Sequence, residues 1–260
     1  MTPQCKDIRA DILRVSHASG HGHIPSCFSV VEILYAVYDF IRHEPGDPDW
    51  EGRDIFILSK GHAALGHYCV LARFGYMPID ALYSFGAFLS DFGCHADRLK
   101  VPGIEASTGS LGHGIGLAVG IALAQRLKKS DREVYTLIGD GEANEGTVWE
   151  AVLVAESLGL QNLTFIYDNN LSHGRGLQVP APEKKLEAFG CHVIAVDGHD
   201  VEALKQAFAE PSPSIKAVVA HTMKGFGCRT MQENHYEWHR KSPGEEEMKR
   251  LLEELDAAAV

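Results

Sequence analysis

Residues 134–146 have the sequence VYTLIGDGEANEG, in which an apolar, β-branched run leads directly into an aspartate flanked by glycines. Such a run predicts a short buried strand, and the helical pattern near Asn144 predicts a helix after it. Similar runs recur along the chain with helical pattern between them, which is typical of a parallel sheet with helices on both faces. We therefore predict an α/β fold. The other runs are 54–58, 163–167, 192–196 and 215–220.

Polar residues follow two of these predicted strands, at the positions where ligands bind in parallel sheets. Asp140 lies between two glycines after one strand, and the residues DNN, 168–170, follow the next. Glycines let the backbone approach a ligand, and a following helix directs free N–H groups at an anion. A carboxylate and an amide oxygen, joined by diphosphate oxygens, suit octahedral Mg²⁺. A lone Gly-Asp-Gly is often a plain turn, but its pairing with the asparagines favours a metal–diphosphate site.

Composition excludes several classes of function. The 260-residue chain carries a formal net charge of −11 and has no basic block, so nothing attracts it to nucleic acid or an anionic membrane. It also lacks the long apolar run that a membrane span requires and the apolar core of a signal peptide. Its 6 cysteines form no CxxC pair. We expect a soluble cytoplasmic protein with free, mostly buried thiols.

No repeat, low-complexity run or linker divides the sequence, which predicts a single domain over residues 1–260 with a helical tail at about 244–258. The segment 107–129 opens a helix at a Gly/Ser-rich turn and is apolar nearly all round, as in helices buried in a core or an interface. Other helices are predicted over 11–20, 29–41 and 60–75.

Several separate segments resemble transketolase, and they follow one another in the order of that family. The Gly-Asp-Gly followed by paired asparagines is similar to the family's thiamine diphosphate motif. The resemblance covers only the amino-terminal, diphosphate-binding domain, and the length is similar to that of the smaller chain in transketolases divided between two polypeptides. The segments are ILSKGHAALGHY (57–68), GCHADRLKVPGIEASTGSLGHGIGLAVGIA (93–122), GDGEANEGTVWEA (139–151), LTFIYDNN (163–170), KGFG (224–227) and EWHRKSP (237–243).

The resemblance implies a metal site for Mg²⁺, or for Ca²⁺ or Mn²⁺ in its place. Asp140 and Asn170 would be ligands, with the backbone carbonyl of Ser172 as a third. Because DNNLSHGRG departs from the family pattern, an alignment gap would instead make Asn169 the ligand and Leu171 the carbonyl donor.

The resemblance also implies how thiamine diphosphate is held. Gly141 would donate its N–H to the diphosphate, and the turn 109–111 would lie along the cofactor with Ser110 where the family has proline. Glu145 is similar to the acidic residue that communicates between the family's two active sites. The implied cofactor-binding set is Gly109, Ser110, Leu111, Gly139, Asp140, Gly141, Glu145, Asn170, His62 and His239.

Four of the 14 histidines match family histidines that line the substrate and diphosphate channel. Imidazole suits that place because it takes up and releases protons near neutral pH. His21 competes with the first of the four and His235 with the last, while His113 stands where the family often has glutamine. Together with Glu145, the implied catalytic residues are His23, His62, His95 and His239.

Two parts of the family's active site are missing from this sequence. The glutamate that protonates the cofactor's aminopyrimidine and the arginines that hold the sugar phosphate belong to the following, pyrimidine-binding domain. The resemblance therefore implies an enzyme subunit that transfers a two-carbon ketol unit from a ketose, such as a sugar phosphate, to an aldose. It would act only with a separate carboxy-terminal subunit carrying that domain, as an α2β2 complex.

Two other interpretations stay open at the level of sequence. One is the alpha-type subunit of a 2-oxoacid dehydrogenase, whose Gly-Asp-Gly region is similar. The other is a non-catalytic homologue with the same fold. The segments SKGHA, GIEASTGSLG and EWHRKSP, and the presence of metal ligands and channel histidines together, favour transketolase.

Overall fold

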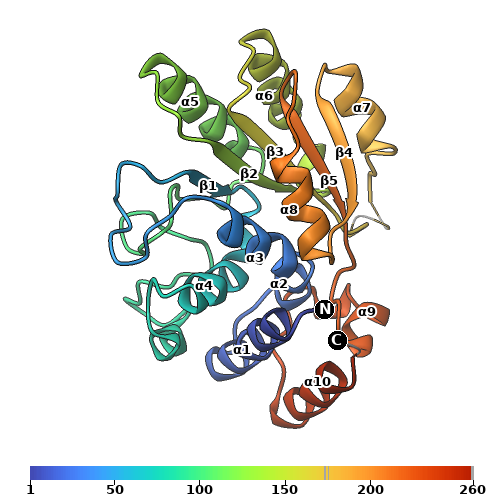
Figure 1. Cartoon of the computed structure of the whole chain (residues 1–260). Coiled ribbons are helices and arrows are strands. Elements are labelled where there is room, and N and C mark those ends of the chain that lie inside the picture. Colours follow the sequence, from blue (N-terminus) through green and yellow to red (C-terminus); the bar gives the residue numbers. More distant parts are fainter. Residues whose placement is uncertain (173, 175, 259–260) are drawn as a thin grey trace.

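A computed structural model describes residues 1–172, 174 and 176–258. Five strands in this part of the chain form one parallel sheet with the order β1-β2-β3-β5-β4 (Figure 1). Each strand starts within one residue of a predicted run, so the predicted α/β fold is confirmed. Runs of β-branched and aromatic residues favour strands because they pack well on a pleated surface. The strands are β1 Ile55–Leu58, β2 Val134–Gly139, β3 Leu163–Asn169, β4 His192–Asp197 and β5 Lys216–His221.

Helices cover both faces of the sheet, and a separate apolar core lies on each face. Successive residues of a strand point to opposite faces. Phe56 and Leu58 accordingly join the core with α1–α4 and α8, whereas Ile55 and Ile57 join the core with α5–α7. The α-helices are α1 Pro3–Ser19, α2 Ile24–Phe28, α3 Val31–Phe40, α4 Ala64–Arg73, α5 His113–Leu127, α6 Gly146–Ser157, α7 Pro182–Ala188, α8 Val201–Ala209, α9 Arg229–Glu233 and α10 Glu245–Ala257; the 3-10 helices are η1 Gly61–Ala63, η2 Ile79–Ser84, η3 Glu142–Asn144 and η4 Glu237–His239.

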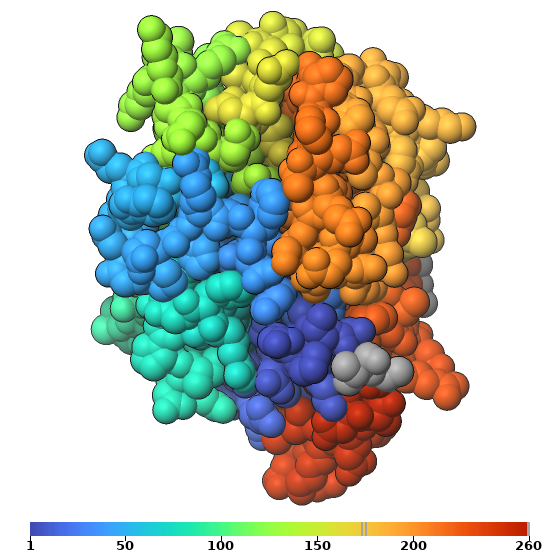
Figure 2. Space-filling view, viewed as in Figure 1, coloured from blue at the N-terminus to red at the C-terminus, as the bar shows by residue number. Residues whose placement is uncertain are grey.

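The predicted helical tail is α10, which packs beside α1 at one end of the molecule (Figure 2). Lys6 and Asp256 form an ion pair of 2.9 Å between these two helices. The helix predicted from residue 11 begins earlier, at Pro3, because the hydroxyl of Thr2 accepts the N–H of Cys5 and caps it. All six cysteines are free, and five of them are buried. Among the described residues, no helix is both long and apolar enough to cross a membrane.

The register of the sheet brings the two polar turns together. Gly139 pairs with Asp168 across β2 and β3, and the Asp140 N–H donates to the Asp168 carbonyl at 3.1 Å. β2 and β3 are therefore neighbouring parallel strands, which brings Asp140 close to residues 168–170. The connections that leave the carboxyl ends of β1, β2, β3 and β5 meet at one edge of the sheet, as parallel strands require.

Candidate active site

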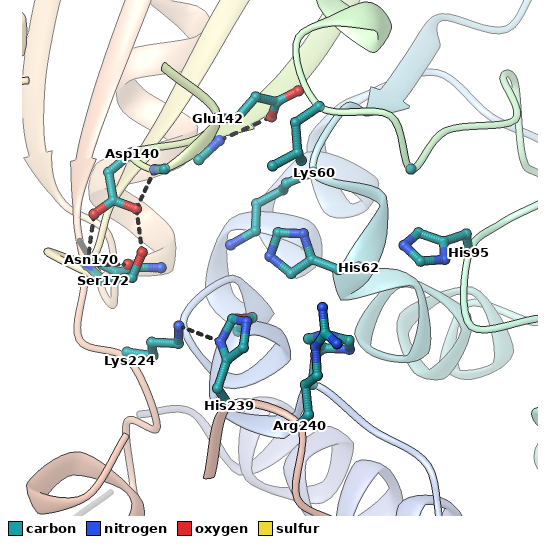
Figure 3. Close-up of a pocket in the computed structure, with 16 residues that line it drawn as sticks. Lys60, His62, His95, Asp140, Glu142, Asn170, Ser172, Lys224, His239 and Arg240 are labelled. Carbon is teal, nitrogen blue, oxygen red and sulfur yellow. Dashed lines mark hydrogen bonds between the residues drawn. The ribbon is translucent and has the colours of Figure 1, made fainter. Parts of the chain in front are cut away.

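A cavity of about 280 Å³ opens at this edge of the sheet (Figure 3). Two lysines, one arginine and four histidines line it, in a protein whose net charge is −11. The charges of the two lysines and the arginine suit an anionic ligand. The lining residues are His23, Ser26, Lys60, His62, His95, Gly109, Leu111, Gly139, Asp140, Gly141, Glu142, Asn170, Ser172, Lys224, His239 and Arg240.

Oxygen atoms of Asp140 and Asn170 converge on one side of the cavity. The Ser172 N–H donates to Asp140 Oδ2 at 2.6 Å and also to Asn170 Oδ1 at 3.0 Å, so both oxygens approach the same point. The Ser172 hydroxyl donates to Asp140 Oδ1 at 2.7 Å, and the Gly141 N–H donates to that oxygen at the same distance. Within the described residues, no group of three or more His, Cys, Asp or Glu side chains is arranged to hold a metal. A cation here would depend on one carboxylate, an amide oxygen and a ligand's own oxygens.

The two consecutive asparagines have different surroundings. Asn170 is buried and lines the cavity, whereas Asn169 is the last residue of β3 and its Nδ2 lies 3.2 Å from His221 Nδ1. Leu171 is exposed and adopts a positive φ of 54° outside the cavity. The structure therefore places Asn170 and Ser172 beside Asp140, whereas the Asn169 side chain lies beside His221.

Three of the predicted histidines, His23, His62 and His239, form a cluster with His23 at its centre. Its ring centroid lies 5.5 Å from that of His62 and 5.2 Å from that of His239. Burial, together with the nearby His239 and Arg240, lowers the pKa of His23 to about 4. Burial and the charge of Lys60 hold the pKa of His62 well below its usual range. Both rings are therefore neutral near pH 7 and able to accept a hydrogen bond.

The fourth predicted histidine, His95, packs against the backbone of Gly109. A Cβ added to Gly109 would lie 2.7 Å from His95 Cδ2, and the glycine has a φ of +150°. Only glycine satisfies both the close approach and this backbone conformation. The turn at 109–111 and the histidine are thus fitted to one another at the edge of the cavity.

Lys224 lies in the cavity with its Nζ 3.1 Å from His239 Nδ1. Burial and the neighbouring Lys60 lower the pKa of Lys224 to about 8. The ammonium is therefore charged at neutral pH and loses its proton in mildly alkaline solution.

Glu142 connects three of the turns that build the cavity. It is buried, and its Oε1 accepts the Ser59 hydroxyl at 2.5 Å and the Gly112 N–H at 2.8 Å. Its Oε2 accepts the Gly139 N–H at 3.3 Å. Burial raises the pKa of this carboxyl. The side chain holds the glycine turn before α5 against the ends of β1 and β2.

Two predicted residues lie outside the cavity. The Ser110 hydroxyl is exposed and lies 3.3 Å from His113 Nδ1. Glu145 is the exposed residue that precedes α6, next to Gly112 at the start of α5. Neither of the competing histidines, His21 and His235, lines the cavity.

Sequence reasoning missed Lys60, Glu142, Lys224 and Arg240. Each stands inside or next to one of the family-like segments: SKGH, GDGE, KGFG and EWHR. Lys60 and Glu142 each follow a predicted strand closely, and that position is the signal that could have identified them. The signal for Lys224 and Arg240 was weaker, because their segments reach the cavity by packing against α2, which is far away in the sequence.

Comparison with known proteins identifies the family. Residues 4–258 match the family described as transketolase, thiamine diphosphate binding domain. The chain is 39% identical to one of the subunits of the apulose-4-phosphate transketolase of Actinobacillus succinogenes, covering 97% of this chain and 94% of that protein. It is 36% identical to a 6-deoxy-6-sulfo-D-fructose transketolase subunit of a Clostridium species, covering 91% and 89%.

Longer transketolases match over part of their length. Human transketolase is 36% identical, and the match covers 95% of this chain but 41% of the human protein. The solved transketolase of Leishmania mexicana superposes with a TM-score of 0.86 and 30% identity, over 95% of this chain and 40% of that one. The chain therefore belongs to the transketolase family of transferases and corresponds to its thiamine-diphosphate-binding domain.

Proposed function

We propose that this chain is the thiamine-diphosphate-binding subunit of a two-chain transketolase. With a separate carboxy-terminal subunit it transfers a two-carbon ketol unit from a ketose to an aldose. The observation that carries the proposal is the convergence of Asp140, Asn170 and Ser172 beside a cavity rich in cationic side chains. The relatives named as subunits support it, because this chain spans about nine tenths of their length. They favour it over a 2-oxoacid dehydrogenase subunit.

The donor set fits Mg²⁺. A carboxylate oxygen of Asp140 and the amide oxygen of Asn170 are hard ligands, and both approach the backbone of Ser172. Mg²⁺ prefers one or two such protein oxygens together with phosphate oxygens. We propose that Asp140, Asn170 and the Ser172 carbonyl hold the ion, with Ca²⁺ or Mn²⁺ able to replace it.

Cationic residues of the chain would hold the diphosphate. Lys60 and Lys224 line the cavity, and so does His62, two residues after Lys60 in the sequence. An ammonium in a buried site attracts phosphate strongly because little water screens the charge. Bound thiamine diphosphate supplies the electron sink for cleaving the bond next to a ketose carbonyl. The chain's own part is to bind and orient that group.

The histidine cluster would bind the sugar hydroxyls. His23 and His62 are neutral near pH 7 and face the cavity, so each offers an unprotonated ring nitrogen as a hydrogen-bond acceptor for a sugar hydroxyl. His95 and His239 extend the same lining, and Arg240 adds a fixed positive charge beside them. We propose an anionic sugar, such as a sugar phosphate, as the ketose.

The outer face of α5 and α6 would bind the partner subunit. We define this outer face as Leu117, Leu127, Leu153, Val154 and Leu158, which are 37–73% exposed. Gly116 and Gly120 lie in open space on the same helix, and Glu145 lies where both helices start. Because α5 follows the cavity-lining turn 109–111, a subunit seated on this face would also reach the cavity. We propose an α2β2 complex, located in the cytoplasm.

Native mass spectrometry of the chain purified from its own source tests this proposal. The expected result is a complex with a second polypeptide, carrying thiamine diphosphate and Mg²⁺. A single chain or homodimer that takes up no thiamine diphosphate when it is added with Mg²⁺ would contradict the proposal.

A further inference from the structure

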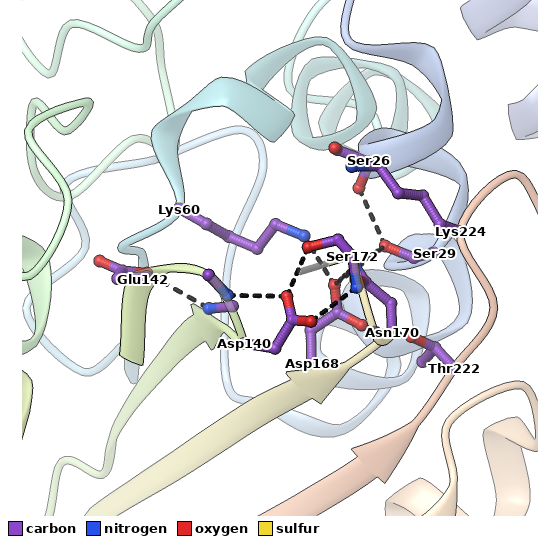
Figure 4. A network of polar contacts seen from close by, with 12 residues as sticks. Ser26, Ser29, Lys60, Asp140, Glu142, Asp168, Asn170, Ser172, Thr222 and Lys224 are labelled. Atoms are coloured by element: carbon purple, nitrogen blue, oxygen red, sulfur yellow. Dashed lines mark hydrogen bonds and ion pairs between the residues drawn. The ribbon is translucent and has the colours of Figure 1, made fainter. Parts of the chain in front are cut away.

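Asp168 is fully buried at the carboxyl end of β3, within a network of polar contacts (Figure 4). Its Oδ2 accepts the Lys60 ammonium at 2.6 Å, the Asn170 amide N–H at 2.8 Å and the Ser29 hydroxyl at 2.9 Å. Its Oδ1 accepts the hydroxyl of Thr222. These four donors come from four separate segments: Ser29 lies between α2 and α3, and the other three follow β1, β3 and β5. Both carboxylate oxygens of Asp168 are therefore engaged by donors of the protein itself.

These contacts determine which way the Asn170 amide faces. Its Nδ2 donates both to Asp168 and to Ser29 Oγ, at 2.8 and 3.1 Å. Its Oδ1 then faces the Ser172 N–H, beside Asp140. The opposite orientation would set the amide oxygen against the carboxylate of Asp168 and the NH₂ group against an N–H. One orientation is therefore strongly preferred before any ligand binds.

The charge of Asp168 is balanced within the protein. Lys60 is 1% exposed and pairs with it, so neither charge is left alone in the interior. A buried carboxylate without such a partner would be costly, and one with it can be retained. The ion pair explains how an aspartate can occupy this place and still serve only as an acceptor.

We propose that Asp168 is a positioning residue for the metal–diphosphate site. It holds the Asn170 amide with its oxygen turned toward Asp140, and so acts on the metal only through that asparagine. The inference rests on the proposed function, because it takes Asn170 to be a metal ligand. Partners of this kind orient the groups that bind a metal, and their loss typically weakens metal affinity by about 10–100-fold.

The test is the Mg²⁺ concentration that gives half-maximal uptake of thiamine diphosphate, measured by calorimetry on the complex as it is purified. In Asp168→Asn, the amide that replaces the carboxylate cannot accept all of these donors, so the Asn170 amide loses its preferred orientation. We expect the half-maximal Mg²⁺ concentration to rise at least about tenfold.

Two further variants separate positioning from loss of the ion pair. Lys60→Met with Asp168→Asn removes both charges, so no unpaired ammonium remains. We expect this double variant to need at least about tenfold more Mg²⁺ than Lys60→Met alone. Asp54→Asn is the matched control, because Asp54 is also buried and pairs with Arg42 at 2.7 Å, but lies at the opposite edge of the sheet.

The outcomes are distinct. Equal Mg²⁺ requirements in the double variant and in Lys60→Met alone would overturn the inference while leaving the proposed function intact. An equal rise in Asp54→Asn would overturn it as well, because the effect would then follow from lost stability. Failure of the unmodified complex to take up thiamine diphosphate with Mg²⁺ would contradict the proposed function and the inference together.

Discussion

At the scale of single residues, Asn169 and Asn170 give the clearest contrast, since they are consecutive but only Asn170 faces Asp140. Asn170→Ala removes the proposed amide ligand, so we expect the Mg²⁺ requirement for thiamine diphosphate uptake to rise at least about tenfold. Asn169→Ala should change it by no more than about twofold, and calorimetric titration of both variants measures the difference. A larger effect at Asn169 would restore the alternative ligand set.

Lys224 predicts a pH dependence of cofactor affinity. Its pKa is lowered to about 8, so its ammonium is lost as the pH rises above 8, and the attraction to diphosphate is lost with it. We expect affinity to fall about tenfold between pH 7 and pH 9. Lys224→Arg should abolish this fall, because a guanidinium stays charged throughout that range. Affinity that does not change with pH in the unmodified protein would contradict this prediction. An equal fall in the arginine variant would show that another group titrates.

The site was predictable from sequence only in part. Asp140, Asn170 and the four histidines belong to short segments that carry their own signal, and the structure brings all six to one cavity. The partnership of Lys60 with Asp168 joins residues 108 positions apart, and no local pattern indicates it. Ser110 and Glu145 were named by resemblance but lie outside the cavity, so their proposed roles depend on what binds the adjacent surface.

At the scale of elements, two glycines of α5 have opposite surroundings. A Cβ on Gly114 would lie 2.7 Å from Ser59 Cα at the end of β1, whereas nothing lies within 4 Å of one on Gly116. Gly114→Ala should destabilise the chain by about 1–3 kcal/mol through overpacking. Gly116→Ala should stabilise it by about 0.5–1 kcal/mol, because alanine favours a helix. Chemical denaturation measures both free energies of unfolding, and equal stability of the two variants would contradict the packing described here.

Strands were predicted more accurately than helices. A strand such as β2 is a continuous β-branched and apolar run bounded by polar residues, so its limits are marked in the sequence. The five-residue helices α2 and α9 were not predicted, because so short a helix is marginal alone and forms through tertiary packing. The predicted helix at 60–75 is divided into η1 and α4. Its first turn tightens where Gly61 meets the backbone of Thr108.

At the scale of the whole molecule, the outer face of α5 and α6 is apolar although nothing in the described part of this chain covers it. Leu117 is 47% exposed there, so Leu117→Glu should leave the fold intact and weaken binding to the partner by about tenfold or more, which is roughly 1.4 kcal/mol. Native mass spectrometry at graded concentrations measures the change. Leu99→Glu is the control, since Leu99 is 87% exposed but lies outside this face. Equal effects of the two substitutions would argue against a partner on α5 and α6.

The central claim is that this chain binds the cofactor but needs a second subunit to act. The most direct measurement is two-carbon ketol transfer from a ketose to an aldose. It is assayed with the isolated chain, with the isolated co-purifying subunit, and with a mixture of the two. We predict transfer only when both subunits are present with thiamine diphosphate and Mg²⁺, and its loss in Asp140→Asn. Transfer by the isolated chain, or full transfer by a complex carrying Asp140→Asn, would contradict the account.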